Sequence, residues 1–196
     1  MFRTFAVIAA AIELSQPKLE AADTERYAKA LQEQAVVHDF DPLTGVAIIH
    51  FESGFDQKAL SKNGEDHGLA QIRARYIGAC KKDPNPKDAP GPACRAVKKK
   101  LLDGVENIKV MAQLITQNRK FCKRKVGSTK FARWLASYQG RNNARRKQWC
   151  KPGDGTYKVM HYRVQLLKQL GKRKELRKEL AVTKPPKSFH VRESDD

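Results

Sequence analysis

Hydrophobic residues in this chain recur mostly at steps of three and four, the spacing that places them on one face of an α-helix. One such helix is predicted over residues 23–40, with an aligned face made of Tyr27, Leu31, Ala35 and His38. The longest helix is predicted between about Cys94 and Lys123, with a stripe made of Val105, Ile108, Met111, Leu114, Ile115, Asn118 and Cys122. No segment shows the sustained two-residue alternation of a strand. The pattern therefore predicts an all-α fold.

Start and stop signals divide the rest of the chain into further helices. Asp41 followed by Pro42 is a usual helix start, and the apolar run that follows ends at Ser53 and Gly54. Further helices are expected over residues 68–81, 128–140 and 157–170. Glu52 is thereby placed in the last turn of a largely buried helix.

Glu52 is the first candidate for chemistry. Apolar surroundings disfavour an ionised carboxylate, and the partial negative charge at a helix C-terminus disfavours it further. A glutamate that keeps its proton near neutral pH can act as a general acid on a leaving oxygen. Taken alone, the position is more often that of a solvated residue at a helix end. The acids in the loop that follows are expected to be solvated: Asp56, Glu65 and Asp66.

Composition is that of a single soluble globular domain. The chain has 196 residues, of which 40% are hydrophobic and 31% charged. No apolar stretch reaches the roughly 20 residues that span a bilayer. An apolar run over residues 5–12 follows Arg3 and precedes the small residues Ala21 and Ala22, which indicates a signal peptide over residues 1–22. The alternative is the apolar face of an ordinary first helix.

Positive charge is concentrated in one half of the chain. The net charge is +18, and residues 98–151 hold 16 Lys and Arg against two acids, whereas residues 1–97 hold 12 against 13. Such a surface attracts polyanions, and anionic envelope polymers and nucleic acid are both candidates. Residues 172–196 are expected to form a charged helix extension followed by a disordered basic tail.

The four cysteines favour disulfides over a metal site. They include no Cys-x-x-Cys pair and have no clustered histidines beside them, so neither a metal nor another cofactor is expected. Three pairings are possible, and we favour Cys80 with Cys94, which closes a Pro-rich loop, and Cys122 with Cys150. Disulfides indicate export, whereas four free buried thiols would indicate a cytosolic protein.

Four short motifs occur along the chain in this order: "ESGFDQKALS", "GLAQI", "DGVENI" and "ASYQG". Together they resemble the soluble lytic transglycosylase catalytic domain, a relative of goose-type lysozyme, over about residues 40–170. The matching residues are Glu52, Ser53, Ala59, Ser61, Gly68, Leu69, Gln71, Asn107, Ile108, Ala136 and Tyr138. The chain departs from the family pattern at Ala70, where Met is usual, at Gln139, where Asn is usual, and in a loop between Ser61 and Gly68 that is one residue longer.

The resemblance implies a lysozyme-like helical domain over residues 23–171. In it Glu52 would be the sole catalytic acid and base, and Ser53 would orient Glu52 or cap its helix. Gln71 would line the saccharide groove, and Tyr138 would place its hydroxyl near Glu52 or a sugar. Asn107 is expected to be a structural hydrogen-bonding residue.

The resemblance also implies an activity. The enzyme would cleave the β-1,4 bond between N-acetylmuramic acid and N-acetylglucosamine in peptidoglycan and form a 1,6-anhydro product, with help from the substrate's N-acetyl group. Two alternatives remain: a hydrolytic lysozyme of the same fold, and a catalytically inactive protein that binds polyanions or nucleic acid. On the leading interpretation the protein is an exported bacterial monomer of the periplasm or cell envelope. Its partners would be glycan strands and anionic envelope polymers, with nucleic acid disfavoured.

Overall fold

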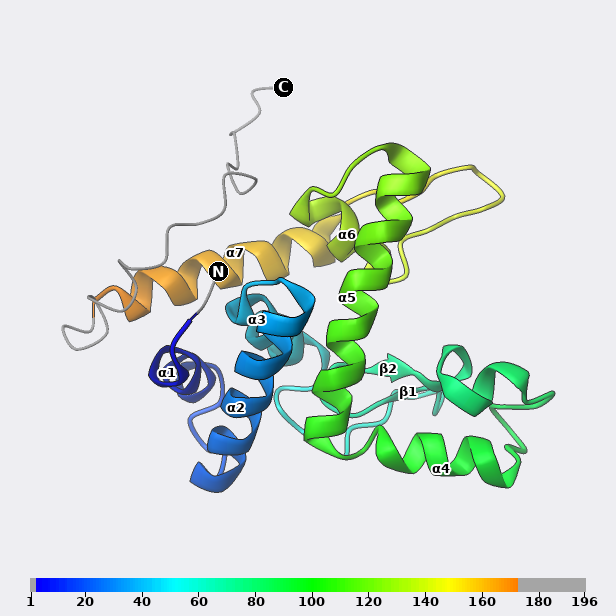
Figure 1. Cartoon of the computed structure of the whole chain (residues 1–196), viewed down its shortest axis with the longest axis horizontal. Coiled ribbons are helices and arrows are strands. Elements are labelled where there is room, and N and C mark those ends of the chain that lie inside the picture. The colour runs from blue at the N-terminus through cyan, green and yellow to red at the C-terminus, as the bar shows by residue number, and fades with distance from the viewer. Residues whose placement is uncertain (1–2, 173–196) are drawn as a thin grey trace.

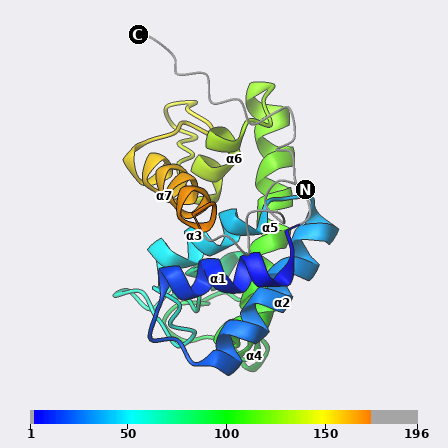
Figure 2. The ribbon, with the colours of Figure 1, turned by 90° about the vertical axis from the view of Figure 1, so that its left-hand side faces the viewer.

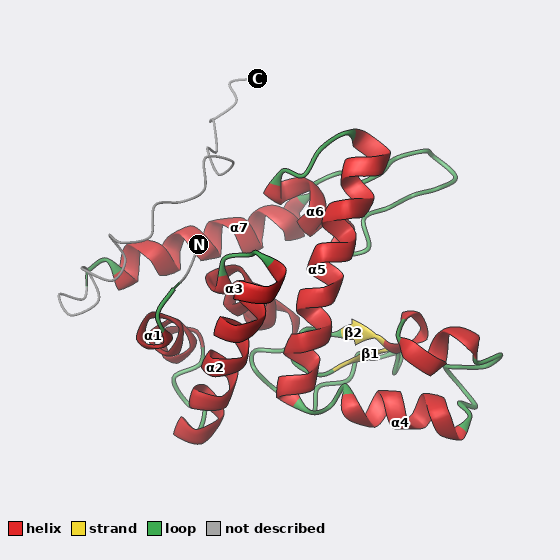
Figure 3. Ribbon diagram, in the orientation of Figure 1, coloured by secondary structure: helices red, strands yellow, loops and turns green. Residues whose placement is uncertain are grey.

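The computed structural model describes residues 3–172, which are mostly helical and confirm the predicted all-α class (Figures 1 and 3). The helices within this range are α1 (Phe5–Ser15), α2 (Ala21–His38), α3 (Pro42–Glu52), α4 (Pro92–Lys100), α5 (Gly104–Val126), α6 (Phe131–Tyr138) and α7 (Asp154–Leu170). The tail predicted over residues 172–196 lies outside the described residues except for Lys172. No helix of the described part is long and apolar enough to cross a membrane.

Helix α3 is the centre of the helical body, where it contacts α1, α2, α5 and α7 (Figures 1 and 2). Every residue from 42 to 49 is buried, because α3 is covered on all sides rather than along one stripe. The predicted start is confirmed: the Asp41 carboxylate accepts a hydrogen bond from the Leu43 N–H at 3.1 Å. The apolar run up to Ile49 is thus the sequence of a helix that is buried until its last turn.

A buried ion cluster holds the N-terminal end of α3. The Asp41 carboxylate pairs with Arg3 at 3.2 Å and with Arg163 of α7. Burial alone would raise the pKa of Asp41, but the two guanidinium groups, Arg163 foremost, hold it below its usual value. The cluster therefore joins the segment before α1, the start of α3 and the middle of α7.

Helix α1 is part of the same core. Val7, Ile8 and Ile12 are each 0% exposed. Just beyond its last turn, the Gln16 side chain donates a hydrogen bond to the Gly54 carbonyl at 2.8 Å, two residues after Glu52. This packing favours the interpretation of residues 5–12 as an ordinary first helix, and a signal peptide over residues 1–22 stays a prediction.

The helix predicted over residues 68–81 is wrong. This segment contributes to a small lobe beside α5, built from a two-stranded antiparallel sheet and short turns of 3-10 helix (Figure 3). Its elements are β1 (Asp66–His67), β2 (Ile72–Arg73), η1 (Ala74–Tyr76) and η2 (Gly78–Lys82). Gly68, Gln71 and Gly78 all have positive φ, the left-handed backbone conformation that interrupts a right-handed helix.

The long helix predicted from about Cys94 is two helices, α4 and α5. The break comes at Asp103, whose carboxylate caps α5 by accepting from the Glu106 N–H at 3.0 Å. Both favoured disulfides are confirmed: Cys80–Cys94 joins η2 to α4, and Cys122–Cys150 joins α5 to the segment before α7.

Candidate active site

Glu52 is the last residue of α3, at the point where the chain leaves the core for the small lobe. Gly54 and Phe55 follow in left-handed conformations, with φ of 61° and 70°, and turn the chain out of the helix. Because α3 is buried on all sides up to Ile49, the Glu52 carboxyl group sits where apolar packing meets the surface.

These surroundings change the acidity of Glu52. Burial first, and the negative charge of Asp66 second, raise the pKa of Glu52 to about 7. A usual glutamate would be almost fully ionised at neutral pH, whereas a large fraction of Glu52 keeps its proton there. The side chain therefore has the property that a general acid requires.

Tyr138, the last residue of α6, contacts the loop that contains Ala70. Its hydroxyl donates to the Ala70 carbonyl at 3.2 Å. Burial and then the charge of Glu52 raise the pKa of the Tyr138 phenol well above its usual value, so the hydroxyl stays protonated. The structure thus brings together Glu52 and Tyr138, which the sequence separates by 86 positions.

Gln71 is half-buried in the same loop. Its amide nitrogen donates to the carbonyl of Ala59 at 3.1 Å and to that of Gly68 at 3.0 Å. Both hydrogen bonds hold the loop in place, so the amide nitrogen of Gln71 is already used within the protein. The amide oxygen takes no part in these two bonds and is the half of the side chain that is suited to a ligand.

Asn107, on α5, holds the loop that contains Gly68 and Gln71, which is the structural role predicted for it. The fully buried side chain donates to the carbonyls of His67 at 2.9 Å and Leu101 at 2.7 Å, and accepts from the Ala70 N–H at 2.8 Å. Gly68 passes so close that a Cβ atom there would lie 2.4 Å from the Asn107 amide nitrogen and 2.1 Å from the Leu101 carbonyl oxygen. Only glycine fits this contact and the positive φ.

Ser53 is the C-cap residue of α3, and its N–H donates to the Ile49 carbonyl at 3.0 Å. The capping bond thus comes from the backbone rather than from the hydroxyl. The Ser53 Oγ is buried and has no hydrogen-bonding partner among residues 3–172. A role for this hydroxyl in orienting Glu52 therefore stays a prediction.

The expectation that Glu65 and Asp66 are solvated loop acids is wrong, because both are largely buried and paired with arginines, and Asp66 is part of the site. Asp66 lies on β1, close enough to raise the pKa of Glu52, and its side chain is 19% exposed. Arg73 on β2 binds both its oxygens, at 2.8 and 3.0 Å. Strands of two residues are too short to leave a periodic signal, so the pairing that makes Asp66 part of the site is not visible in the sequence.

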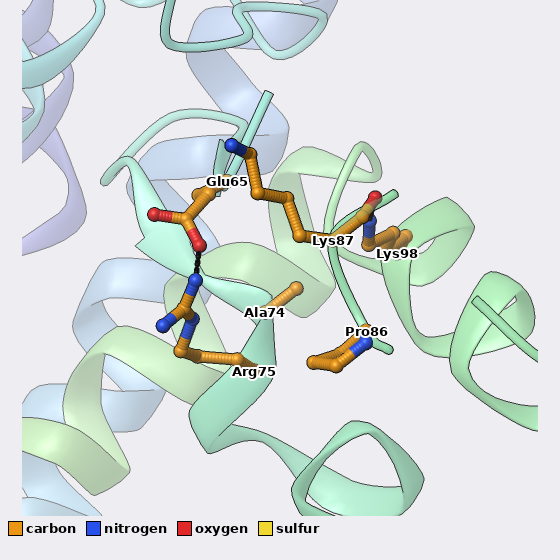
Figure 4. A pocket seen from close by; sticks show the side chains of 6 residues that line it. All are labelled: Glu65, Ala74, Arg75, Pro86, Lys87 and Lys98. Atoms are coloured by element: carbon orange, nitrogen blue, oxygen red, sulfur yellow. Dashed lines mark hydrogen bonds and ion pairs between the residues drawn. The ribbon is translucent and has the colours of Figure 1, made fainter. Parts of the chain in front are cut away.

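A small pocket in the same lobe does not have Glu52 in its lining (Figure 4). It is lined by Glu65, Ala74, Arg75, Pro86, Lys87 and Lys98. An ion pair between Glu65 and Arg75 crosses its wall, so the Glu65 carboxylate, like that of Asp66, is already engaged by an arginine.

A helical body, a small lobe with a short hairpin, and one protonatable glutamate where the two meet define a lysozyme-like domain. The family model for the transglycosylase SLT domain matches residues 29–158, and the chain belongs to this family. Membership makes it a peptidoglycan-cleaving enzyme of the lytic transglycosylase type. No curated protein and no solved structure gives a significant match to the chain.

Proposed function

We propose that this enzyme cleaves the β-1,4 bond between N-acetylmuramic acid and N-acetylglucosamine without water, leaving a 1,6-anhydro end. The observation that carries the proposal is the single glutamate at the buried end of α3, whose pKa is raised to about 7. Such a group can give a proton to the leaving sugar and then accept one within the same turnover.

The proton moves in two steps. Protonated Glu52 donates to the glycosidic oxygen as the bond from that oxygen to the anomeric carbon of N-acetylmuramic acid breaks. The carbonyl oxygen of that sugar's own N-acetyl group bonds to the anomeric carbon meanwhile. The C6 hydroxyl then displaces this oxygen and passes its proton to the Glu52 carboxylate, which restores the acid for the next cycle.

This route requires no second catalytic carboxylate, and the nearby acids support it. A two-carboxylate glycosidase needs a partner that is free to act as nucleophile or base. Here Asp66 is bound by Arg73 and Glu65 by Arg75. Asp56 is exposed and accepts a hydrogen bond from the Lys58 N–H at 2.8 Å. Substrate assistance is therefore the mechanism that these neighbours favour.

Three other residues would position the glycan. The unpartnered Ser53 hydroxyl would bond to a sugar or to the ionised form of Glu52, since a buried hydroxyl left without a partner is costly. The Gln71 amide oxygen would accept from a sugar hydroxyl. Tyr138 would hold the loop at Ala70 and shield Glu52 from water.

Peptidoglycan lies outside the cytoplasmic membrane, so we place the protein in the bacterial periplasm or cell envelope. The two disulfides support an oxidising compartment.

Replacing Glu52 with glutamine tests the proposal. Glu52→Gln keeps the shape of the side chain and cannot donate the proton, so release of fragments from purified cell walls should fall by about 10²–10⁴-fold. Glu33→Gln, an exposed glutamate of α2, is the matched control and should leave the rate unchanged. Near-normal cleavage by Glu52→Gln with an unchanged circular dichroism spectrum would rule the mechanism out.

Mass spectrometry of the wild-type products decides the reaction type. An anhydro product is one water lighter than the reducing end that a hydrolytic lysozyme leaves. Products that carry the extra water would show that the enzyme hydrolyses the bond instead of closing the anhydro ring. Glu52 would still be the acid.

A further inference from the structure

Basic residues without intervening acids form one continuous stretch of the sequence. Between Glu106 and Asp154 there is no Asp or Glu. Ten Lys and Arg side chains of this stretch are exposed: Lys120, Lys123, Arg124, Lys125, Lys130, Arg141, Arg145, Arg146, Lys147 and Lys151. We refer to them as the basic face.

The fold gathers the basic face at one end of the molecule. The C-terminal end of α5, α6 and the loop of residues 140–151 lie together in the upper part of Figures 1 and 2, whereas α4 lies at the bottom. The Cys122–Cys150 disulfide ties the loop to α5. Arg141 adds a hydrogen bond across the base of the loop, from its Nε to the Lys151 carbonyl at 3.2 Å. Charges up to 31 residues apart in sequence are thus gathered at one end of the molecule.

The charges of the basic face are not neutralised locally. None of the ten side chains forms an ion pair with an acid in the part of the chain that the structure describes. Like charges at this density repel one another, and a polyanion that lies across them relieves the repulsion. The face is therefore suited to a ligand with several negative charges.

Two aromatic rings on this face argue against nucleic acid as that ligand. Proteins that bind single strands offer aromatic faces on which bases stack. Here the Phe121 and Trp149 rings pack edge to face at 5.7 Å. The Lys125 ammonium covers the Trp149 ring at 4.9 Å from its centre, and the Arg124 guanidinium lies 5.9 Å from the Phe121 ring centre. Both rings are occupied by the protein's own cations.

The basic face also adjoins the active site. Its loop begins at Arg141, three residues after Tyr138, which lies beside Glu52. A polymer bound at Glu52 that carries charged side groups would hold those groups near the loop that follows α6. Electrostatic attraction acts over about a Debye length, roughly 8–10 Å.

We propose that the basic face binds the carboxylates of the peptides attached to peptidoglycan strands. This inference rests on the proposed peptidoglycan substrate, whose muramic acid residues carry short peptides with free carboxyl groups. The basic face acts as an electrostatic tether: it raises the affinity for peptide-bearing glycan and leaves the chemistry at Glu52 unchanged. Peptide-free glycan of the same length keeps only the lactyl carboxylate of each muramic acid and therefore gains less from it.

The test compares binding to two forms of the same cell wall. Intact walls, and the glycan strands that an amidase leaves when it removes the peptides, are each immobilised and titrated with the inactive Glu52→Gln protein, so that no cleavage disturbs the equilibrium. The triple variant Lys123→Gln, Arg145→Gln, Arg146→Gln is made in the same background, because these side chains have no hydrogen-bonding or ionic partner within residues 3–172. Its affinity for intact walls should fall about tenfold at low salt and match the parent's near 1 M salt.

The matched control removes the same charge elsewhere. Lys18→Gln, Lys29→Gln, Lys168→Gln changes three exposed lysines away from the basic face and should bind intact walls within twofold of the parent. On the peptide-free strands, which keep only the lactyl carboxylates, the difference between the two triple variants should be much smaller than on intact walls.

Two results would overturn the inference: equal binding of the two triple variants to intact walls, or the same tenfold loss on peptide-free strands. Stronger competition by duplex DNA than by free wall peptides would assign the face to nucleic acid instead. Since binding is measured without turnover, failure of the tether and failure of Glu52 as the acid give different results.

Discussion

The helical body and the small lobe support the active site in different ways. In the body, Glu52 ends a helix whose packing is apolar on every side and whose start is held by the buried Arg3–Asp41–Arg163 cluster. In the small lobe, the loop with Gln71 has little regular structure and is held by side-chain hydrogen bonds from Asn107 and Tyr138. The acid is thus fixed by the core, and the residues around it by individual polar contacts.

This difference predicts how each region fails. Damage to the body should reduce stability first, and activity only through unfolding. Damage to the small lobe should reduce activity more than stability, because the loop can move while the core persists.

Removing residues 1–16 should give the largest effect. The deletion takes Val7, Ile8 and Ile12 out of the core and Arg3 away from Asp41. Each lost apolar side chain costs about 2–5 kcal/mol, so the three together cost about as much as the 5–15 kcal/mol that stabilises an ordinary domain, and the loss of the Arg3–Asp41 pair adds to this. We expect no cooperative transition in urea. A truncated protein with the full-length midpoint would show that α1 is dispensable and would favour the signal-peptide interpretation.

Asp41→Asn should come next, at about 3–5 kcal/mol. Asparagine can still cap α3, but two buried guanidinium groups lose their counter-ion. The midpoint of urea unfolding measures the loss. Asp39→Asn is the control two residues away, because the Asp39 side chain is 89% exposed and its contact with Arg119 is 3.8 Å long. A loss below 1 kcal/mol for Asp41→Asn would mean that the cluster does not hold the body together.

Asn107→Ala breaks the small lobe and should cost about 2–4 kcal/mol, because it leaves the Ala70 N–H and the carbonyls of His67 and Leu101 without their partner. Cell-wall cleavage at a temperature where the variant is fully folded should fall more than tenfold. Gln113→Ala, an exposed position on the same helix, should change neither quantity. Full activity in the folded Asn107→Ala protein would contradict the view that this amide keeps the site in shape.

The smallest expected effect is a shift in the pKa of Glu52 when the charge of Asp66 is changed. Asp66→Asn removes a like charge and should lower the pKa of Glu52, so the alkaline decline of kcat/KM moves to lower pH. Arg73→Gln leaves the Asp66 charge unpaired and should move that decline to higher pH. Each shift should be less than about one pH unit. Shifts in the same direction for both variants would show that this pair does not tune the acid.

Local signals in the sequence predicted the body well. The Asp41–Pro42 start, the buried run of α3 and the apolar stripe of α5 all follow from capping and periodicity, which are properties of neighbouring residues. The two disulfides followed from cysteine spacing and the Pro-rich loop. Glu52 followed from its place at the end of a buried run together with the motif order.

The small lobe was predicted poorly for a physical reason. Residues 68–81 have an apolar pattern compatible with a helix, but three of them adopt left-handed conformations, and hydrogen bonds with Asn107 and Tyr138 hold the loop at Ala70. The Asp66–Arg73 pairing and the occupied donor side of Gln71 also depend on contacts across the fold. The burial of α1 was open in the sequence, where the same apolar residues suit a leader or a core helix.

The close contact between Gly68 and Asn107 has a consequence for how this enzyme can change over generations. A side chain at position 68 would strike the amide of Asn107 and the Leu101 carbonyl, so the glycine cannot drift while that amide stays. Substitution of Asn107 by a smaller residue relieves only part of the clash and forfeits three hydrogen bonds. The two positions should therefore be inherited as a unit, and a library that randomises both should return the original pair far more often than either partner with a new companion.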